Sequence, residues 1–125
     1  MGVTSPDQMA GAFMERFNAR DQTALADLYT DDAVFTYNGS DKAVGRQQIE
    51  GAIAGFMAAG LTFKGEFVTC YVAGDTAMTR MKWELIEPSG SQMSAGISAE
   101  VLRRCSDGKW RFLIDDAGGG SRAAT

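Results

Sequence analysis

The clearest structural signal in this chain is Glu100-Val-Leu-Arg-Arg-Cys-Ser-Asp-Gly-Lys-Trp-Arg-Phe-Leu-Ile-Asp-Asp116, where two apolar and aromatic runs flank Ser106-Asp107-Gly108. Two such runs joined by a short turn of this composition predict a β-hairpin. The hairpin carries carboxylic acids into strand faces that are otherwise apolar. Burying an acid there is costly unless it has a partner or a task, so the hairpin also indicates where a site lies.

The rest of the C-terminal half shows the same period of two. Apolar residues alternate with polar ones, and short turns separate the runs, which predicts an antiparallel meander with strands over 61–73, 77–86, 93–105 and 110–116. A strand of about twelve residues spans about 40 Å when straight, whereas a domain of this length has a radius of gyration of about 14 Å. The strands must therefore bend, and Gly65 and Gly96 are the expected places.

The N-terminal half predicts three helices and one short strand. Ser5-Pro6-Asp7 is typical of a helix start, and an apolar stripe follows to about residue 19. Further helices are expected over about 21–30 and 45–60, with a strand at 33–37. The fold class is therefore α+β: a cone-shaped, strongly curved antiparallel sheet wrapped around three N-terminal helices, with a cavity between them. Residues 1–116 form the single domain, and 117–125 are expected to be a disordered Gly/Ala-rich tail.

The composition argues against several classes of function. The 125 residues carry a net charge of -4 with no basic stripe, so no nucleic-acid partner is expected. The sequence shows no apolar run long enough to span a membrane and no pattern of a signal peptide. We therefore expect no membrane association and a cytoplasmic location. With no histidine, Ser-His and Cys-His nucleophile pairs and His-based metal sites are excluded. Cys70 and Cys105, about 9 to 10 Å apart in the expected sheet, are predicted to be free thiols. Neither a metal nor a cofactor is expected.

Several segments together resemble a known superfamily. They are Phe17-Asn18-Ala19-Arg20-Asp21, Leu28-Tyr29-Thr30-Asp31-Asp32-Ala33-Val34-Phe35, Gly74-Asp75-Thr76-Ala77, Val101-Leu102-Arg103-Arg104 and Asp107-Gly108-Lys109-Trp110-Arg111. In order and spacing, residues 6–116 resemble the nuclear transport factor 2 (NTF2)-like superfamily, in its ketosteroid-isomerase-like branch with the SnoaL-type cyclases. The resemblance implies the cone-shaped fold, also called a cystatin-like roll, a homodimer packed through the outer sheet face, and a deep apolar pocket. Its members include isomerases, cyclases, epoxide hydrolases, dehydratases and domains that only bind or assemble, so it implies no single activity.

The resemblance also implies positions for three functional groups. Ketosteroid isomerases use a carboxylate base, a tyrosine donor and a protonated aspartic acid donor. By position these correspond here to Tyr37, Phe13 and Glu100. Only Glu100 keeps a comparable group, so steroid isomerisation by that mechanism is not expected.

Glu100 is the first candidate for a catalytic residue. Because side chains alternate along a strand, Glu100 is expected on the same face as Ser98 and Leu102. A regular hairpin sets it opposite Ile114, with Asp116 about 6–8 Å away on the diagonal. A register slip of one residue brings Asp115 there instead. Burial and a neighbouring acid both raise a carboxyl pKa, which suits a proton donor or a shared-proton pair. The structural alternative is a glutamate at the cavity rim, paired with Arg103 or Arg111.

Three functions stay open at this point. The first is an enzyme without a cofactor, of isomerase, cyclase or dehydratase type, acting on a small hydrophobic carbonyl or hydroxyl compound with Glu100, Tyr37 and Asp116 as catalytic residues. The second is a non-catalytic domain in which Glu100 and Tyr37 only hydrogen-bond a ligand. The third is a dimeric interaction module whose cavity is filled by its own side chains. The expected ligand-binding residues of the pocket are Phe13, Phe17, Phe56, Met81, Trp83, Leu102 and Phe112.

Overall fold

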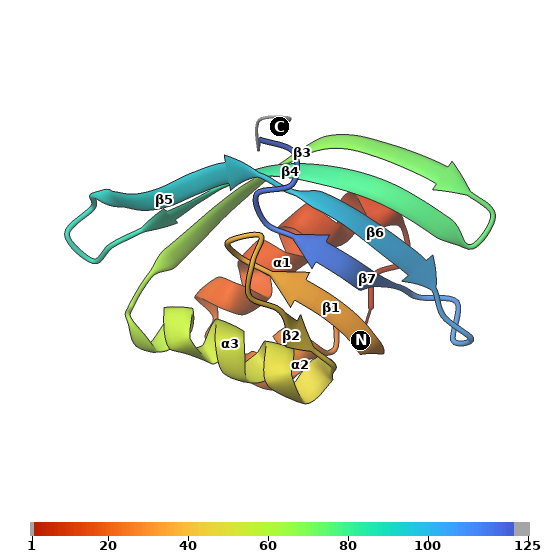
Figure 1. Ribbon diagram of the computed structural model, residues 1–125, viewed down its shortest axis with the longest axis horizontal. Helices are drawn as coiled ribbons and strands as arrows, with labels where there is room; N and C mark the ends of the chain where they lie inside the picture. Colours follow the sequence, from red (N-terminus) through yellow and green to blue (C-terminus); the bar gives the residue numbers. More distant parts are fainter. Residues whose placement is uncertain (1, 122–125) are drawn as a thin grey trace.

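A curved sheet arches over three helices in the computed structural model, which describes residues 2–121 (Figure 1). The strand order is β2-β1-β7-β6-β4-β3, and β5 also pairs with β4. The strands are β1 Tyr29–Thr36, β2 Ala43–Val44, β3 Thr62–Ala73, β4 Thr76–Ile86, β5 Gln92–Ile97, β6 Ala99–Arg104 and β7 Trp110–Asp116. The expected α+β architecture is confirmed.

The helices begin and end close to the sequence signals. A 3-10 turn, Pro6–Gln8, leads into α1 (Met9–Asn18); α2 spans Gln22–Ala26 and α3 spans Arg46–Ala58. The Asp21 side chain caps α2 by accepting a hydrogen bond from the Ala24 N–H at 3.1 Å. The second helix ends earlier than predicted, because β1 begins at Tyr29. That difference moves Tyr29 from a helix end into the sheet.

One predicted strand is in fact two. The segment expected to run from 93 to 105 is interrupted at Ser98, which separates β5 from β6. Both pieces pair with β4, β5 along Lys82–Ile86 and β6 along Thr76–Thr79. The Ser98 hydroxyl accepts a hydrogen bond from the Met81 N–H at 2.9 Å, so the interruption is tied to the middle of β4. The two halves of β4 therefore pair with two successive strands, both antiparallel to it.

The hairpin register differs from the simplest prediction. Val101 pairs with Ile114 but Leu102 pairs with Phe112, so Leu113 is an extra residue in β7. This β-bulge sets Glu100 opposite Asp115, and the predicted pairing of Glu100 with Ile114 is wrong. The bulge also explains why Phe112 and Asp115 both face inward while Ile114 is exposed. In addition, β7 pairs in parallel with β1, an arrangement that the antiparallel meander did not include.

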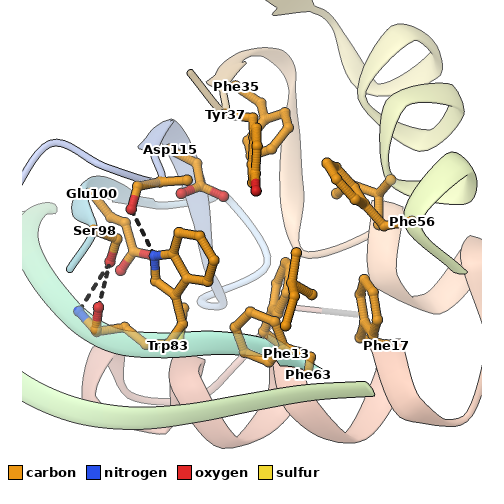
Figure 2. A pocket seen from close by; sticks show the side chains of 14 residues that line it. Phe13, Phe17, Phe35, Tyr37, Phe56, Phe63, Trp83, Ser98, Glu100 and Asp115 are labelled. Carbon is orange, nitrogen blue, oxygen red and sulfur yellow. Dashed lines mark hydrogen bonds between the residues drawn. The ribbon is translucent and has the colours of Figure 1, made fainter. Parts of the chain in front are cut away.

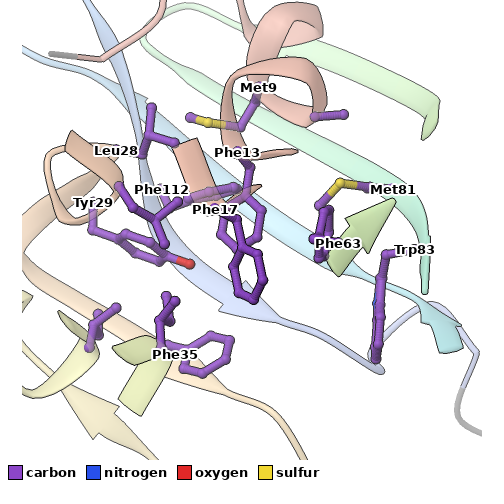
Figure 3. Packing of buried hydrophobic residues seen from close by; sticks show 14 of the residues in the cluster. Met9, Phe13, Phe17, Leu28, Tyr29, Phe35, Phe63, Met81, Trp83 and Phe112 are labelled. Carbon is purple, nitrogen blue, oxygen red and sulfur yellow. The ribbon is translucent and has the colours of Figure 1, made fainter. Parts of the chain in front are cut away.

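The core lies between the concave face of the sheet and the helices (Figure 3). Aromatic rings dominate it: the ring centroids of Phe13 and Phe63 are 4.7 Å apart, and those of Tyr29 and Phe112 are 4.9 Å apart. Trp83 of β4 pairs with a glycine on each side, Gly65 of β3 and Gly96 of β5. Gly65 leaves room for the side chains of Phe63 and Met81, and Gly96 leaves room for the Trp83 indole. A Cβ atom on Gly96 would lie 3.1 Å from the Trp83 ring.

The segment after β7 is hydrogen-bonded to the sheet as far as it is described. The Ala117 N–H donates to the Thr36 carbonyl at 3.0 Å, and the Gly120 N–H donates to the Ile97 carbonyl at 2.8 Å. The expectation of a disordered tail from residue 117 therefore does not fit residues 117–121, and residues 122–125 lie outside the described part. Both cysteines are free. Among the described residues, no helix is long and apolar enough to cross a membrane.

Candidate functional site

A cavity opens between the helices and the concave sheet face (Figure 2). Its volume is about 50 Å³, counted as the space open to the centres of water-sized molecules. With the radius of those molecules added, this is room for roughly one six-membered ring. The wall consists mostly of aromatic and aliphatic side chains from α1, α3, β1, β3 and β4: Phe13, Phe17, Phe35, Tyr37, Ile53, Phe56, Phe63, Met81, Trp83 and Leu85, with Ser98, Glu100, Asp115 and Ala117 completing it.

The structure brings most of the expected lining residues to this cavity. Phe13, Phe17, Phe56, Met81 and Trp83 all lie on its wall. Two others do not: Leu102 and Phe112 are fully buried in the core and do not line the cavity. Both side chains face inward as expected. Phe112, however, packs against the rings of Tyr29 and Phe13.

Glu100 points inward and is buried, with 2% of its surface exposed. The Thr79 hydroxyl donates a hydrogen bond to its Oε1 atom at 2.7 Å. Its Oε2 atom has no hydrogen-bond partner among the described residues. The alternative of a rim glutamate paired with arginine is wrong, because Arg103 pairs with Asp32 and Arg111 with Asp107.

The second acid of the site is Asp115, not Asp116. Asp115 is buried opposite Glu100 and lines the cavity, because the bulge at Leu113 turns it inward. The Tyr29 hydroxyl donates a hydrogen bond to Asp115 Oδ2 at 2.5 Å. Asp116 is only half-buried and does not line the cavity. Of the two possibilities that the sequence left open, the slipped register is the one observed.

Burial raises the pKa of both carboxyl groups. For Glu100 the loss of hydration is the main cause and the nearby Asp115 charge adds to it, while the Thr79 and Ser98 hydroxyls lower its pKa in part. For Asp115 burial again raises the pKa, the Tyr29 hydrogen bond opposes the rise, and the charge of Asp116 adds to it. The Tyr29 phenol has a pKa raised well above its usual value, first by burial and then by the Asp115 charge. Tyr29 therefore remains a hydrogen-bond donor.

Tyr37 stands at the wall of the cavity. Its ring packs against Phe56, with centroids 4.9 Å apart, and against Trp83 at 6.0 Å. Figure 2 shows its hydroxyl directed toward the open space between these rings. Phe35, Tyr37 and Phe56 also line a neighbouring outer hollow of about 250 Å³, counted in the same way. These three rings therefore border both the cavity and the outer hollow, which we take as the cavity entrance.

Two residues that hydrogen-bond the buried acids, Tyr29 and Thr79, were not identified from the sequence. Tyr29 gave no usable signal, because its contact with Asp115 depends on the parallel pairing of β1 with β7. Thr79 did give one: it is the polar residue in the inward-facing series Ala77, Thr79, Met81, Trp83 and Leu85. A hydroxyl on a face that is otherwise apolar indicates a buried acceptor nearby.

The cavity is poor in charge other than its two acids. Neither lysine nor arginine lies among its lining residues. No group of three or more acidic or sulfur ligands that would hold a metal ion occurs in the described part of the chain. The arrangement suits a neutral molecule with a hydrogen-bonding oxygen at one end.

The fold has the architecture of proteins described as NTF2-like and cystatin-like. The model of the SnoaL-like domain matches residues 10–112. This chain therefore belongs to the SnoaL-like domain family. No curated protein is significantly similar to it.

Solved structures share the fold at low sequence identity. An NTF2-like protein with a cystatin-like fold from Novosphingobium aromaticivorans has a TM-score of 0.74 at 23% identity, over 88% of this chain and 79% of that one. A ketosteroid isomerase-like protein from Erwinia carotovora atroseptica has 0.68 at 22%, over 88% and 90%. A putative calcium/calmodulin-dependent protein kinase type II association domain from Thiobacillus denitrificans has 0.78 at 18%, over 94% and 97%. These likenesses concern the fold alone.

Proposed function

We propose that this protein binds a small, neutral, largely hydrophobic molecule with a carbonyl or hydroxyl oxygen and acts on it by acid/base chemistry. The observation that carries the proposal is the Oε2 atom of Glu100, a buried oxygen without a partner among the described residues, on a residue that lines an apolar cavity. A buried polar atom without a partner is costly, and a ligand oxygen that pairs with it removes that cost. Neutral ligands are favoured over anions, because the lining offers acids and no cation.

The two carboxyl groups suit opposite roles in an isomerase-type reaction. Asp115, as carboxylate, takes a proton from the carbon next to the substrate carbonyl. The neutral carboxyl of Glu100 hydrogen-bonds the carbonyl oxygen and stabilises the enolate, with the Tyr37 hydroxyl as a second donor. Asp115 then returns its proton to another carbon, so neither carboxyl changes its net protonation. In a cyclase reaction the same enolate would attack a second carbonyl of the substrate, whose oxygen takes up a proton; in a dehydratase reaction Asp115 would take a proton while Glu100 protonates a departing hydroxyl, which leaves as water.

Binding is tested with three small rings that differ at one group: cyclohexenone, cyclohexene and cyclohexanecarboxylate. Trp83 lies on the cavity wall, so its fluorescence reports occupancy. We expect cyclohexenone to bind more tightly than cyclohexene, and the carboxylate not to bind. Glu100→Ala should weaken cyclohexenone binding by roughly tenfold while cyclohexene binds at least as well. Glu66→Gln, an exposed glutamate on β3, is the control that should change nothing. Equal affinity for ketone and hydrocarbon would remove the proposed role of Glu100.

Catalysis is tested separately from binding. In heavy water, base-catalysed enolisation introduces deuterium next to the carbonyl, and proton NMR follows its incorporation into a panel of cyclic ketones. Asp115→Asn removes the proposed base, so it should retain ketone binding and lose the acceleration of exchange, whereas Glu100→Gln keeps a weaker hydrogen-bond donor and should only slow the exchange. If the native protein binds ketones without accelerating exchange in any of them, the non-catalytic binding domain is the correct function.

Association of two copies is a second candidate, supported by a row of apolar side chains on the outer sheet face. Cross-strand partners point to the same face of a sheet. The pairings give one continuous row across six strands: Tyr71, Met78, Val101, Ile114, Val34 and Val44. Tyr71 is 68% exposed and Met78 is 48% exposed. An exposed apolar row of this extent is typical of an interface, and we propose a second copy of this chain as its occupant.

A further inference from the structure

Two buried acids that face each other do not both ionise readily, and the position of the remaining proton decides what each can do. Glu100 and Asp115 are cross-strand partners, and each is nearly inaccessible to solvent. If the proton lies on Glu100, the cavity ends in a donor. If it lies on Asp115, Glu100 is an acceptor and the proposed chemistry is reversed.

We propose that Tyr29 is a positioning residue that keeps the negative charge of the pair on Asp115 and thereby the proton on Glu100. The inference deepens the proposed function and rests on it only for its consequence in catalysis. The Tyr29 hydroxyl donates to Asp115 Oδ2 at 2.5 Å. A donor at that distance stabilises a carboxylate more than a carboxylic acid. Glu100 accepts a longer hydrogen bond, from the Thr79 hydroxyl at 2.7 Å.

The hydrogen bonds of Glu100 indicate which of its oxygens carries the proton. The Thr79 hydroxyl donates to Oε1, which makes Oε1 an acceptor, as the carbonyl oxygen of a neutral acid is. The proton then belongs on Oε2, the atom with no partner among the described residues. Figure 2 shows the Glu100 carboxyl beside the Trp83 indole at the end of the cavity. Oε2 is therefore the Glu100 oxygen whose hydrogen-bonding capacity is left for a bound molecule.

The other groups packed around the pair act in both directions: the Thr79 and Ser98 hydroxyls lower the Glu100 pKa, and burial and the Asp115 charge raise it. The hydroxyl of Tyr29 comes from β1, that of Tyr37 from the residue after β1, that of Thr79 from β4 and that of Ser98 from the break between β5 and β6, while β7 adds the half-buried Asp116. From α1 and α3 come only apolar rings and aliphatic chains in the cavity lining: Phe13, Phe17, Ile53 and Phe56. No cation among the lining residues neutralises Glu100, whereas Asp115 has the Tyr29 donor. Because burial raises the Tyr29 pKa further, that donor keeps its proton while the carboxyl groups titrate.

The test is a carbon-13 NMR titration of the side-chain carboxyl groups in the ligand-free protein, with Glu and Asp labelled in separate samples. Glu100→Gln and Asp115→Asn assign the two signals. At pH 7 we expect a protonated carboxyl at Glu100 and an ionised one at Asp115. In Tyr29→Phe the Asp115 midpoint should rise by about one to two pH units, and the Glu100 signal at pH 7 should move toward the ionised position. Tyr71→Phe, which removes an exposed phenol, should change neither.

Several outcomes overturn the inference. They are an ionised Glu100 with a protonated Asp115, two carboxyls both ionised below about pH 5, or a Tyr29→Phe titration identical to that of the native protein. If Tyr29→Phe does not fold, Asp115→Asn decides: removing the neighbouring charge should lower the Glu100 midpoint by about one pH unit, and an unchanged midpoint contradicts the coupling. The titration uses the protein without a ligand, so it does not depend on ketone binding. If it shows the expected protonation states but no ketone binds, the proposed function is rejected and the role of Tyr29 stands.

Discussion

Glu100 occupies a position that is costly for a charge and tolerable for a neutral acid, since only one of its carboxyl oxygens is hydrogen-bonded within the described protein. In the unfolded chain Glu and Asp ionise near about pH 4, whereas the folded state holds its protons to higher pH because burial raises both pKa values. The contribution to stability is therefore complete below the unfolded pKa and is lost as pH rises toward the folded pKa.

Because this contribution to stability is lost as pH rises, the free energy of unfolding should depend measurably on pH. Between about pH 5 and pH 8, where a chain without histidine has few other groups that titrate, the free energy of unfolding should fall by about 1 to 3 kcal/mol. Glu100→Gln should remove much of the decline, and Glu66→Gln should keep it. Urea denaturation at a series of pH values measures both. A stability that rises over this range would mean that the buried carboxyls are ionised in the folded state.

Thr79 has a separate effect on stability at the same site. Thr79→Val keeps the shape of the side chain but leaves both oxygens of the buried Glu100 carboxyl without a donor. We expect a loss of about 1 to 3 kcal/mol in the free energy of unfolding. Thr76→Val, at an exposed position of the same strand, is the matched control and should be nearly neutral. Equal effects of the two changes in urea denaturation would mean that the Thr79 hydrogen bond contributes nothing.

At the scale of elements, β4 shapes the cavity by holding Trp83 between two glycines on its neighbours. The Trp83 Nε1–H donates to the Ala117 carbonyl at 2.6 Å, so the indole is fixed to the segment after β7 and cannot easily move aside. Gly96 was expected to mark a bend, and in the structure it also gives room for this ring. The packing of β5 on β4 therefore depends on the missing side chain.

Gly96→Ala should lower the free energy of unfolding by about 1 to 3 kcal/mol, because its Cβ atom overpacks the fixed indole. It should also weaken cyclohexenone binding, since Trp83 lies on the cavity wall. Gly55→Ala is the opposite control: it lies on the exposed face of α3 with open space around it, so it should stabilise by about 0.5 to 1 kcal/mol. Thermal denaturation and the fluorescence titration provide both readouts; destabilisation by Gly55→Ala would contradict the packing argument.

The elements were largely predictable because their signals are local. Alternation identified the strands, and the capping residue Asp21 identified α2. What could not be predicted depends on contacts between distant segments. The bulge at Leu113 decides whether Asp115 or Asp116 faces Glu100, and a bulge has no fixed sequence signature at a leucine. Tyr29 reaches Asp115 only because β1 lies beside β7, a pairing that joins residues 86 positions apart. The best single residue of the site, Glu100, was visible because an acid on an apolar strand face is rare.

At the scale of the whole molecule, the sheet has two faces with different tasks. The concave face carries the acids and the aromatic rings of the cavity, and the outer face carries the apolar row from Tyr71 to Val44. Because side chains alternate along each strand, Glu100 faces the cavity while its neighbour Val101 belongs to the row. Association through the outer face would therefore cover the row without blocking the cavity entrance.

Sedimentation velocity tests this division. The native protein should sediment as a dimer, and Met78→Lys should shift it to the monomer, because a charge in the centre of an apolar interface is left without hydration. Gln47→Lys places the same charge on the exposed face of α3 and should leave the dimer intact. A native protein that is monomeric at all practical concentrations would show that the row has another role.

The most direct test of the recognition of a ligand oxygen by Glu100 is a crystal structure of the protein with cyclohexenone. The ring should occupy the cavity among Phe13, Phe56 and Trp83, with its oxygen about 3 Å from Glu100 Oε2. A ring that enters the cavity with its oxygen turned away from Glu100, or that is found only outside the cavity, would contradict the account.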